Sequence, residues 1–137
     1  MVLALLGVIA ALAAPTAALL DRRRSANDVT RTAASVADLL GEARMTALAR
    51  NTTVEVLIEP GSARAWVLIG TGRERRLGAT ITFARAPGVD LLGRARVRFA
   101  FDASGTAAAD TLFVRGAEVT QRVTVDPWSG AADVSGR

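Results

Sequence analysis

The run MVLALLGVIAALAAPTAALL, residues 1–20, carries no charged side chain and decides how this chain is organised. A helix of twenty residues rises about 1.5 Å per residue and is therefore roughly 30 Å long, which matches the hydrocarbon thickness of a bilayer. Such a run also occurs as a buried core helix. Every face of this helix is apolar, however, and a chain of 137 residues is too small to surround it. We therefore expect a membrane helix or a secretory signal.

Gly7 and Pro15 interrupt this apolar run. Proline removes one backbone donor, so we expect the helix to kink or open locally at Pro15. The alternative explanation is that glycine and proline are simply commoner in membrane helices than in soluble ones. A glycine followed by a proline eight residues later, within residues 2–15, resembles the N-terminal helix of type IV pilins and type II secretion pseudopilins.

This resemblance implies that the apolar helix holds the protein in the inner membrane and later in the core of a helical fibre. The family also has a basic leader, a glycine cut by the prepilin peptidase, a modified aromatic first residue and a glutamate soon after. None of these precedes Gly7 here, so we expect them to be encoded upstream of Met1. Without that glutamate, self-assembly through its contact is in doubt. The residues expected to form the membrane and assembly helix are Val2, Leu3, Leu5, Leu6, Gly7, Val8, Ile9, Leu12 and Pro15.

The composition restricts the classes of function. Hydrophobic residues make up 50% of the chain and charged residues 22%, which is enough for one small domain beyond the helix. There is no Cys, so neither disulfides nor thiolate metal sites are expected. His and Tyr are absent as well, which removes the usual general base, and the carboxylates show no metal-ligand spacing. We therefore expect no enzyme, no metal and no cofactor.

The positive net charge of the chain leaves a nucleic acid as a possible binding partner. The formal net charge is +4, and all 17 basic residues are arginines. The use of arginine as the only basic residue, in an alanine-rich chain, is most simply explained by a GC-rich coding sequence. A strongly basic protein is nevertheless also suited to binding an acidic partner. Arg94, Arg96 and Arg98 alternate, which would place them on one face of a strand, where they would either meet phosphates or be solvated. We favour the solvated face.

Two segments follow the apolar run. The sequence Asp21-Arg22-Arg23-Arg24 ends the membrane-compatible part, and its arginines favour a cytoplasmic flank, whereas the pilin resemblance implies a periplasmic one. Residues 27–50 then have a helical period, and residues 51–53 end the helix. One stripe is expected to pack on the following domain, and it consists of Val29, Ala33, Val36, Leu40, Ala43 and Ala47. Another face carries Arg31, Ser35, Asp38 and Glu42.

Beyond residue 51 the period changes to two, which predicts strands. The strands are expected at residues 53–59, 64–69 (with Trp66), 77–84, 96–101, 111–115, 118–125 and 131–134, with an exposed loop at 70–76. We thus predict an α+β fold, with a membrane segment at 1–20, an amphipathic continuation of the helix at 21–50 and a small, mostly antiparallel sheet domain at 51–137.

Three strings make the resemblance more specific. They are EARMTALARN (residues 42–51), VRFAFDASG (97–105) and VTVDPWSG (123–130), and they are similar to strings of the minor pseudopilin H of type II secretion and of FimT-type minor pilins. This resemblance implies a pilin-like fold, a single-pass inner-membrane protein with a periplasmic domain, and assembly near the tip of the pseudopilus that exports folded proteins across the outer membrane. The implied partners are other pseudopilins and the inner-membrane secretion platform, together with the prepilin peptidase if a leader precedes Met1.

Two other functions fit the sequence. A FimT-like minor pilin would bind DNA for uptake through Arg94, Arg96 and Arg98. An ordinary signal peptide, cleaved near Ala17 or Ala18, would release the β domain, although no basic segment precedes the apolar run and the run is long for a signal.

Trp128 is the one side chain that we single out as a possible partner contact. It lies in the expected turn at residues 126–130, where a tryptophan is either a lid on the core or an exposed anchor. We expect the lid.

Overall fold

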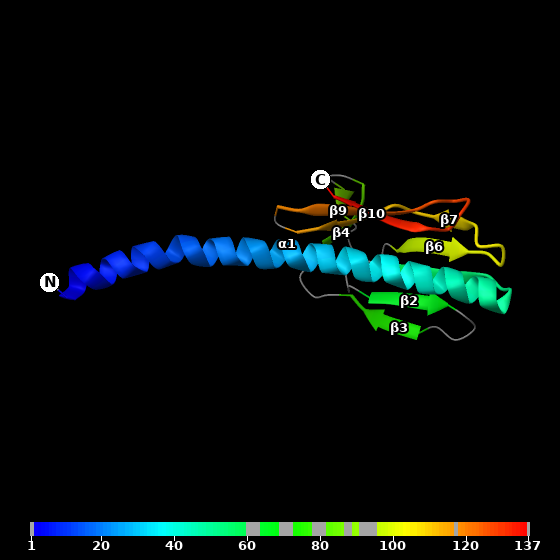
Figure 1. Ribbon diagram of the computed structural model, residues 1–137, viewed down its shortest axis with the longest axis horizontal. Helices are drawn as coiled ribbons and strands as arrows, with labels where there is room; N and C mark the ends of the chain where they lie inside the picture. The colour runs from blue at the N-terminus through cyan, green and yellow to red at the C-terminus, as the bar shows by residue number, and fades with distance from the viewer. Residues whose placement is uncertain are drawn as a thin grey trace.

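The computed structural model describes residues 2–59, 64–68, 73–77, 82–86, 89–90, 96–116 and 118–136, with the backbone alone for residues 2–16, 66, 73–76, 82–86 and 89–90. One helix precedes ten strands in these residues (Figure 1). The elements are α1 (Val2–Arg50), β1 (Val54–Glu59), β2 (Arg64–Leu68), β3 (Arg73–Arg76), β4 (Thr82–Ala86), β5 (Val89–Asp90), β6 (Val97–Phe101), β7 (Ala107–Ala109), β8 (Leu112–Arg115), β9 (Thr120–Val125) and β10 (Ala132–Gly136). The predicted α+β arrangement, a long helix followed by antiparallel strands, is confirmed.

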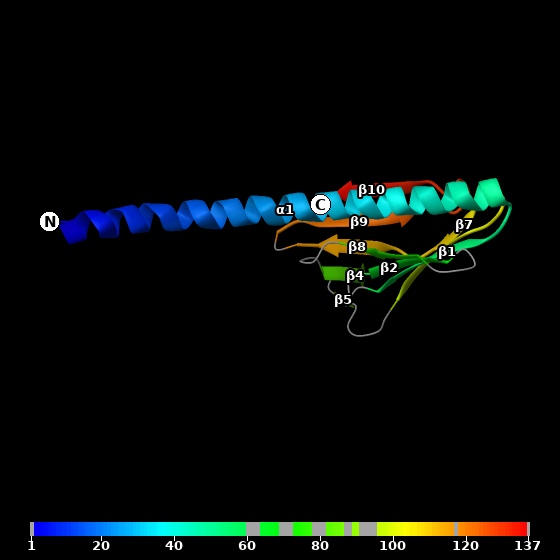
Figure 2. The same ribbon diagram turned by 90° about the horizontal axis from the view of Figure 1, so that it is seen from below.

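Helix α1 has 49 residues and runs without a break through Gly7 and Pro15. At about 1.5 Å per residue it is roughly 73 Å long, and its N-terminal part extends well beyond the β domain (Figures 1 and 2). The predicted local opening at Pro15 does not occur. The helix bows gently in this part instead, because a proline removes a single hydrogen bond and neighbouring turns absorb the distortion as curvature.

The C-terminal half of α1 lies along the β domain, as its periodicity predicts. All six residues of the predicted stripe are buried, and Leu39 joins them. The charged face at Arg31, Asp38 and Glu42 is exposed. An apolar stripe of this width buries itself against a sheet because that removes it from water, and this packing rather than helix propensity stabilises a surface helix.

The end of α1 follows from Asn51. Its φ is +50°, in the left-handed region, which asparagine tolerates better than most residues. The N–H of Thr52 donates to the carbonyl of Ala47 at 3.2 Å, and the N–H of Asn51 donates to that of Leu48 at 3.4 Å. These two bonds form a Schellman motif, which turns the chain from α1 into β1.

The strands form two five-stranded sheets instead of the single sheet predicted. One has the order β3-β2-β1-β6-β7, the other β10-β9-β8-β4-β5, and every pairing between the described strands is antiparallel. The predicted loop at 70–76 is wrong in its second half, since Arg73–Arg76 pairs with β2 as an edge strand. Charged residues are typical of edge strands, which bond on one side only. Of the predicted strand 77–84, Leu77 is not in a strand and residues 82–84 belong to β4, whereas residues 78–81 lie outside the described part.

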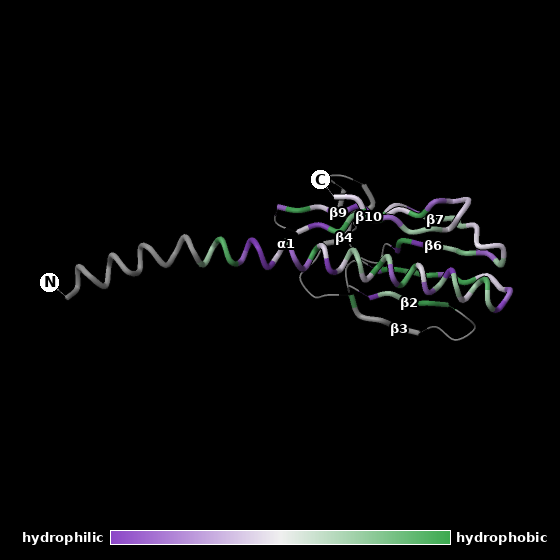
Figure 3. The backbone as a smooth tube through the Cα atoms, viewed as in Figure 1, coloured by the Kyte–Doolittle hydropathy of each residue, from purple (hydrophilic) through white to green (hydrophobic). Residues whose placement is uncertain are grey.

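The core lies between α1 and the two sheets (Figure 2). Phe99 and Phe101 are fully buried, as is Val123, and Val125 packs against the core from its edge. These side chains alternate along β6 and β9, so each of the two strands turns one face toward the core. Figure 3 shows the contrast along α1, where a hydrophobic turn is followed by a hydrophilic turn just before the helix reaches the β domain.

Candidate assembly and partner-binding surfaces

The N-terminal end of α1 is the first candidate surface. Leu19 and Leu20 are 56% and 55% exposed, although both are large and apolar. The predicted membrane segment falls mostly on residues 2–16, whose side chains lie outside the described part of the structure, so its assembly residues stay a prediction. Among the residues that the structure describes, no helix carries an apolar stretch long enough to cross a membrane.

The β domain meets α1 just after the arginine run. Arg22 Nε lies 3.2 Å from a carboxylate oxygen of Glu118, in the segment between β8 and β9. In the same segment, a Cβ on Gly116 would lie 2.6 Å from Val29 Cγ2 and 2.9 Å from Ser25 Oγ. Only a glycine permits this close approach. The contact therefore fixes the point along α1 at which the β domain begins.

The opposite end of the β domain carries two turns, and we call it the distal end because it is farthest from the N-terminus (Figure 1). The first is the Asp102 turn, residues 102–106, between β6 and β7. Asp102 Oδ1 accepts hydrogen bonds from the hydroxyl of Ser104 at 2.6 Å and from its N–H at 2.8 Å. These bonds, together with one from the Thr106 hydroxyl, lower the pKa of Asp102 to about 2.

The second is the Trp128 turn, residues 126–130, between β9 and β10. Asp126 Oδ1 accepts hydrogen bonds from the N–H of Ser129 at 2.7 Å and from that of Trp128 at 3.0 Å. The bond from the Ser129 N–H is the main reason that the pKa of Asp126 is lowered. The N–H of Gly130 closes the turn on the carbonyl of Asp126 at 2.8 Å. The turn predicted at these residues is therefore confirmed.

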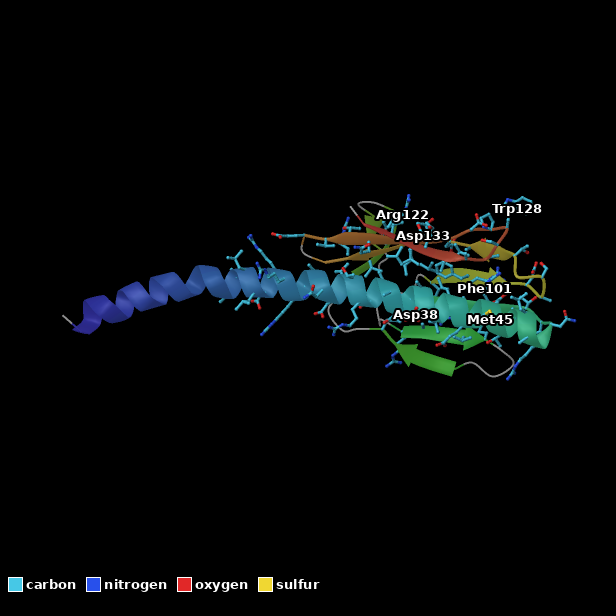
Figure 4. All side chains as sticks on the ribbon, in the orientation of Figure 1. Asp38, Met45, Phe101, Arg122, Trp128 and Asp133 are labelled. Atoms are coloured by element: carbon cyan, nitrogen blue, oxygen red, sulfur yellow. The ribbon has the colours of Figure 1, made fainter. Side chains whose placement is uncertain are left out.

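The predicted lid is wrong, because Trp128 is 85% exposed and points away from the domain (Figure 4). The space beneath the turn is already filled. A Cβ on Gly130, whose φ is +67°, would lie 2.1 Å from the carbonyl oxygen of Gly105 and 2.9 Å from Arg44 Cδ. Gly105 lies in turn against Leu48 of α1. Backbone and helix side chains thus close the core at this end, and the indole remains outside.

Arg44 and one backbone bond join the two turns. The N–H of Ala107 donates to the carbonyl of Pro127 at 2.9 Å, which links the two sheets. Arg44 Nε is buried against Gly130 and has no hydrogen-bond partner among the residues that the structure describes. An arginine stem in such a place acts mainly through packing. The distal end is therefore held from three sides, by α1 and by both turns.

The arginine row predicted for DNA contact is only partly described, since Arg94 lies outside the described residues. Arg96, directly before β6, and Arg98, on the outward face of β6, are both exposed. Each is paired with a carboxylate of β1: Arg96 Nε lies 3.6 Å from Glu59, and Arg98 bonds to Glu55. This bond lowers the pKa of the Glu55 carboxyl. Two positive charges of the row are thus balanced locally, which makes this face less suited to phosphates.

A family model described as type II transport protein GspH matches residues 32–130. The chain belongs to the GspH family. The match covers most of the part of α1 that packs on the domain, strands β1 to β9 and both turns of the distal end. It confirms the resemblance to pseudopilin H. This GspH-family protein is accordingly a pseudopilin of type II secretion, with a periplasm-facing domain that associates with other pseudopilins. No curated protein and no solved structure matches the chain.

Proposed function

We propose that this protein is a minor pseudopilin that assembles near the tip of the periplasmic pseudopilus and helps to drive folded proteins across the outer membrane. The family match over residues 32–130 carries the proposal. The shape supports it, because a helix of roughly 73 Å whose N-terminal part extends beyond a small domain is suited to packing many helices side by side while their domains face outward (Figure 2).

In this proposal, residues 1–20 first hold the protein in the inner membrane as a single span and then join the core of the fibre. Their lack of charge supports both roles, since lipid and a bundle of apolar helices are equally suitable surroundings. The exposure of Leu19 and Leu20 supports the same role. The prepilin peptidase removes a leader encoded upstream of Met1, and the inner-membrane secretion platform adds the subunit to the fibre.

Taken alone, the arginine run at residues 22–24 favours the cytoplasmic side of the membrane. Its position in the structure is nevertheless compatible with a periplasmic domain. It lies where α1 enters the domain, and the Arg22 guanidinium is close to the Glu118 carboxylate. A basic leader upstream would outweigh the remaining positive charge in setting the orientation.

The test is the N-terminal sequence and intact mass of the protein isolated from its own cells. We expect a chain that begins several residues before Met1, with a modified aromatic residue followed by a glutamate. A chain that begins between Thr16 and Asp21 would mean an ordinary signal peptide, and the pseudopilin role would fall. Deletion of the gene should also abolish secretion of type II substrates, and reintroduction should restore it.

No observation in the described residues favours the DNA-uptake alternative. Its test is the binding of duplex DNA at low salt. Because Glu55 and Glu59 balance Arg98 and Arg96, we expect no measurable binding. Salt-dependent binding that is lost only when Arg94, Arg96 and Arg98 are all replaced would favour DNA uptake instead.

A further inference from the structure

We propose that Trp128 is the anchor by which this protein docks on the globular domain of a neighbouring pseudopilin, in an apolar pocket bordered by lysine or arginine. The identity of the partner rests on the proposed function. The exposure and rigidity of the anchor do not depend on it.

Trp128 is the most exposed large hydrophobic side chain among the described residues, at 85%, against 61% for Met45, the next. Tryptophan has a large apolar area and one N–H donor, and it is among the residues most enriched at the energetic centres of protein interfaces. A single indole that stands out from a turn fits a pocket on a partner better than a flat surface. Cutting such an anchor to alanine typically weakens an interface on the order of 30-fold or more.

The turn is held in place before any partner arrives. Asp126 fixes the N–H groups of Trp128 and Ser129, and the Ser129 hydroxyl accepts a bond from the N–H of Ala131 at 3.2 Å. Gly130 is packed on the backbone of Gly105. A preorganised turn loses little conformational entropy on binding, and this cost is one of the main terms that reduce affinity.

The position of the turn points to the partner. Trp128 lies at the distal end, away from the N-terminal part of α1 (Figure 4). In a fibre of parallel α1 helices, that end faces along the fibre toward the domain of another subunit and away from the membrane. Apolar side chains of α1 are exposed toward the same end, since Met45 is 61% exposed and Leu48 is 38% exposed.

Charge gives the character of the pocket. Asp102 and Asp126 are exposed, and hydrogen bonds lower the pKa of both, so both carry negative charge at neutral pH. They make the two turns themselves acidic, whereas the basic residues at this end, Arg44 and the exposed Arg50, belong to α1. Arg44 lies between α1 and the two turns, with its Nε buried. A pocket bordered by basic side chains is therefore complementary to the Trp128 turn, whereas an acidic border would be repelled.

The experiment places the photo-crosslinking residue p-benzoylphenylalanine at position 128 of the full chain, in its own cells during secretion. Asp133 is the matched control, because it is exposed on β10 outside the turn (Figure 4). We expect a crosslink to another pseudopilin from position 128 and a much weaker one from position 133. A crosslink to a second copy of this chain or to an exported protein would overturn the assignment of the partner. Absence of any crosslink with secretion intact would overturn the anchor itself.

A second measurement separates this inference from the proposed function. Trp128→Ala should lower secretion several-fold while the thermal midpoint of the purified protein stays unchanged, because the side chain is outside the core. Trp128→Phe should restore part of the loss. If deletion of the gene stops secretion but Trp128→Ala secretes normally, the anchor is wrong and the pseudopilin role stands. If deletion leaves secretion intact, the proposed function fails.

Discussion

Replacing Gly130 by alanine should destabilise the protein strongly, because Gly130 is where the two turns of the distal end meet. Its φ of +67° is in the left-handed region, which costs an alanine about 1–2 kcal/mol. The new Cβ would also lie 2.1 Å from the carbonyl oxygen of Gly105. A backbone atom cannot move aside alone, so the neighbouring turn must shift, and overpacking of this kind costs about 1–3 kcal/mol. We expect a total loss of about 2–5 kcal/mol.

Gly41→Ala is the matched control, because it is the same substitution but is expected to change the stability in the opposite direction. Gly41 lies inside α1, and a Cβ there would meet nothing within 4 Å. Glycine inside a helix costs about 0.5–1 kcal/mol relative to alanine. Gly41→Ala should therefore stabilise the protein by about that amount.

Thermal unfolding of the full chain in detergent, followed by circular dichroism at low protein concentration, measures both effects. For a domain of about 100 residues, 1 kcal/mol corresponds to about 4–8 °C in the midpoint. Gly130→Ala should lower the midpoint by at least about 8 °C, and Gly41→Ala should raise it by a few degrees. A Gly130→Ala midpoint close to that of the wild type would refute the close packing of the two turns. Equal shifts in the same direction for both variants would refute the reasoning from local geometry.

Three further predictions concern the core, the acidic turn and the sheet surface. Phe99→Ala should lower the free energy of unfolding by about 3–5 kcal/mol in urea titration, because the ring is fully buried; a loss below about 1 kcal/mol would contradict the burial. The pKa of Asp102 is lowered to about 2, so its contribution to stability is complete above the ordinary carboxyl pKa and is lost as the pH falls toward 2. Asp102→Asn should therefore flatten the fall in thermal midpoint below about pH 5, and an unchanged pH profile would argue against the turn. Arg98→Gln should leave the midpoint nearly unchanged, because its ion pair with Glu55 is exposed to solvent; a large drop would mean that the pair is structural.

The sequence predicts best those parts of the fold whose signal is local. The stripe on α1 was readable because its period is fixed by the helix, and the alternation around Phe99 was readable because each side chain on a strand has one of two faces. Asn51 ends α1 for a local reason as well, since its conformation depends on its own side chain and the last turn of the helix.

The parts that were missed depend on contacts between distant segments. Strand β3 is rich in charge and was expected to be a loop, but pairing with β2 makes it a strand. Strand β7 consists of three alanines, which carry no alternation. The division into two sheets is set by which strands pair: β4 does not pair with β3, which precedes it in the chain, but pairs with β5 on one side and with the distant β8 on the other. The hydrophobic period of a single segment carries no information about which distant strand it pairs with.

The candidate surfaces show the same limit. The row Arg96 and Arg98 was visible in the sequence, but its neutralisation was not, because Glu55 and Glu59 lie some forty residues earlier in the chain. A signal was nevertheless present, since both glutamates fall on the outward phase of their strand. Trp128 was placed wrongly as a lid, because nothing in its turn reveals that Gly105 and Leu48 already fill the space beneath.

The distribution of exposed apolar side chains bears on the choice between an assembly subunit and a free exported domain. Among the described residues, the large exposed ones gather at two ends. Leu19 and Leu20 lie on the projecting part of α1, and Met45, Leu48, Leu68 and Trp128 lie toward the distal end. A free domain would leave both ends in water, which is unfavourable for large apolar groups. A subunit with neighbours along a fibre axis covers both, because each end meets another subunit. The position of the exposed apolar surface, and not only its amount, therefore supports a protein that functions between neighbours.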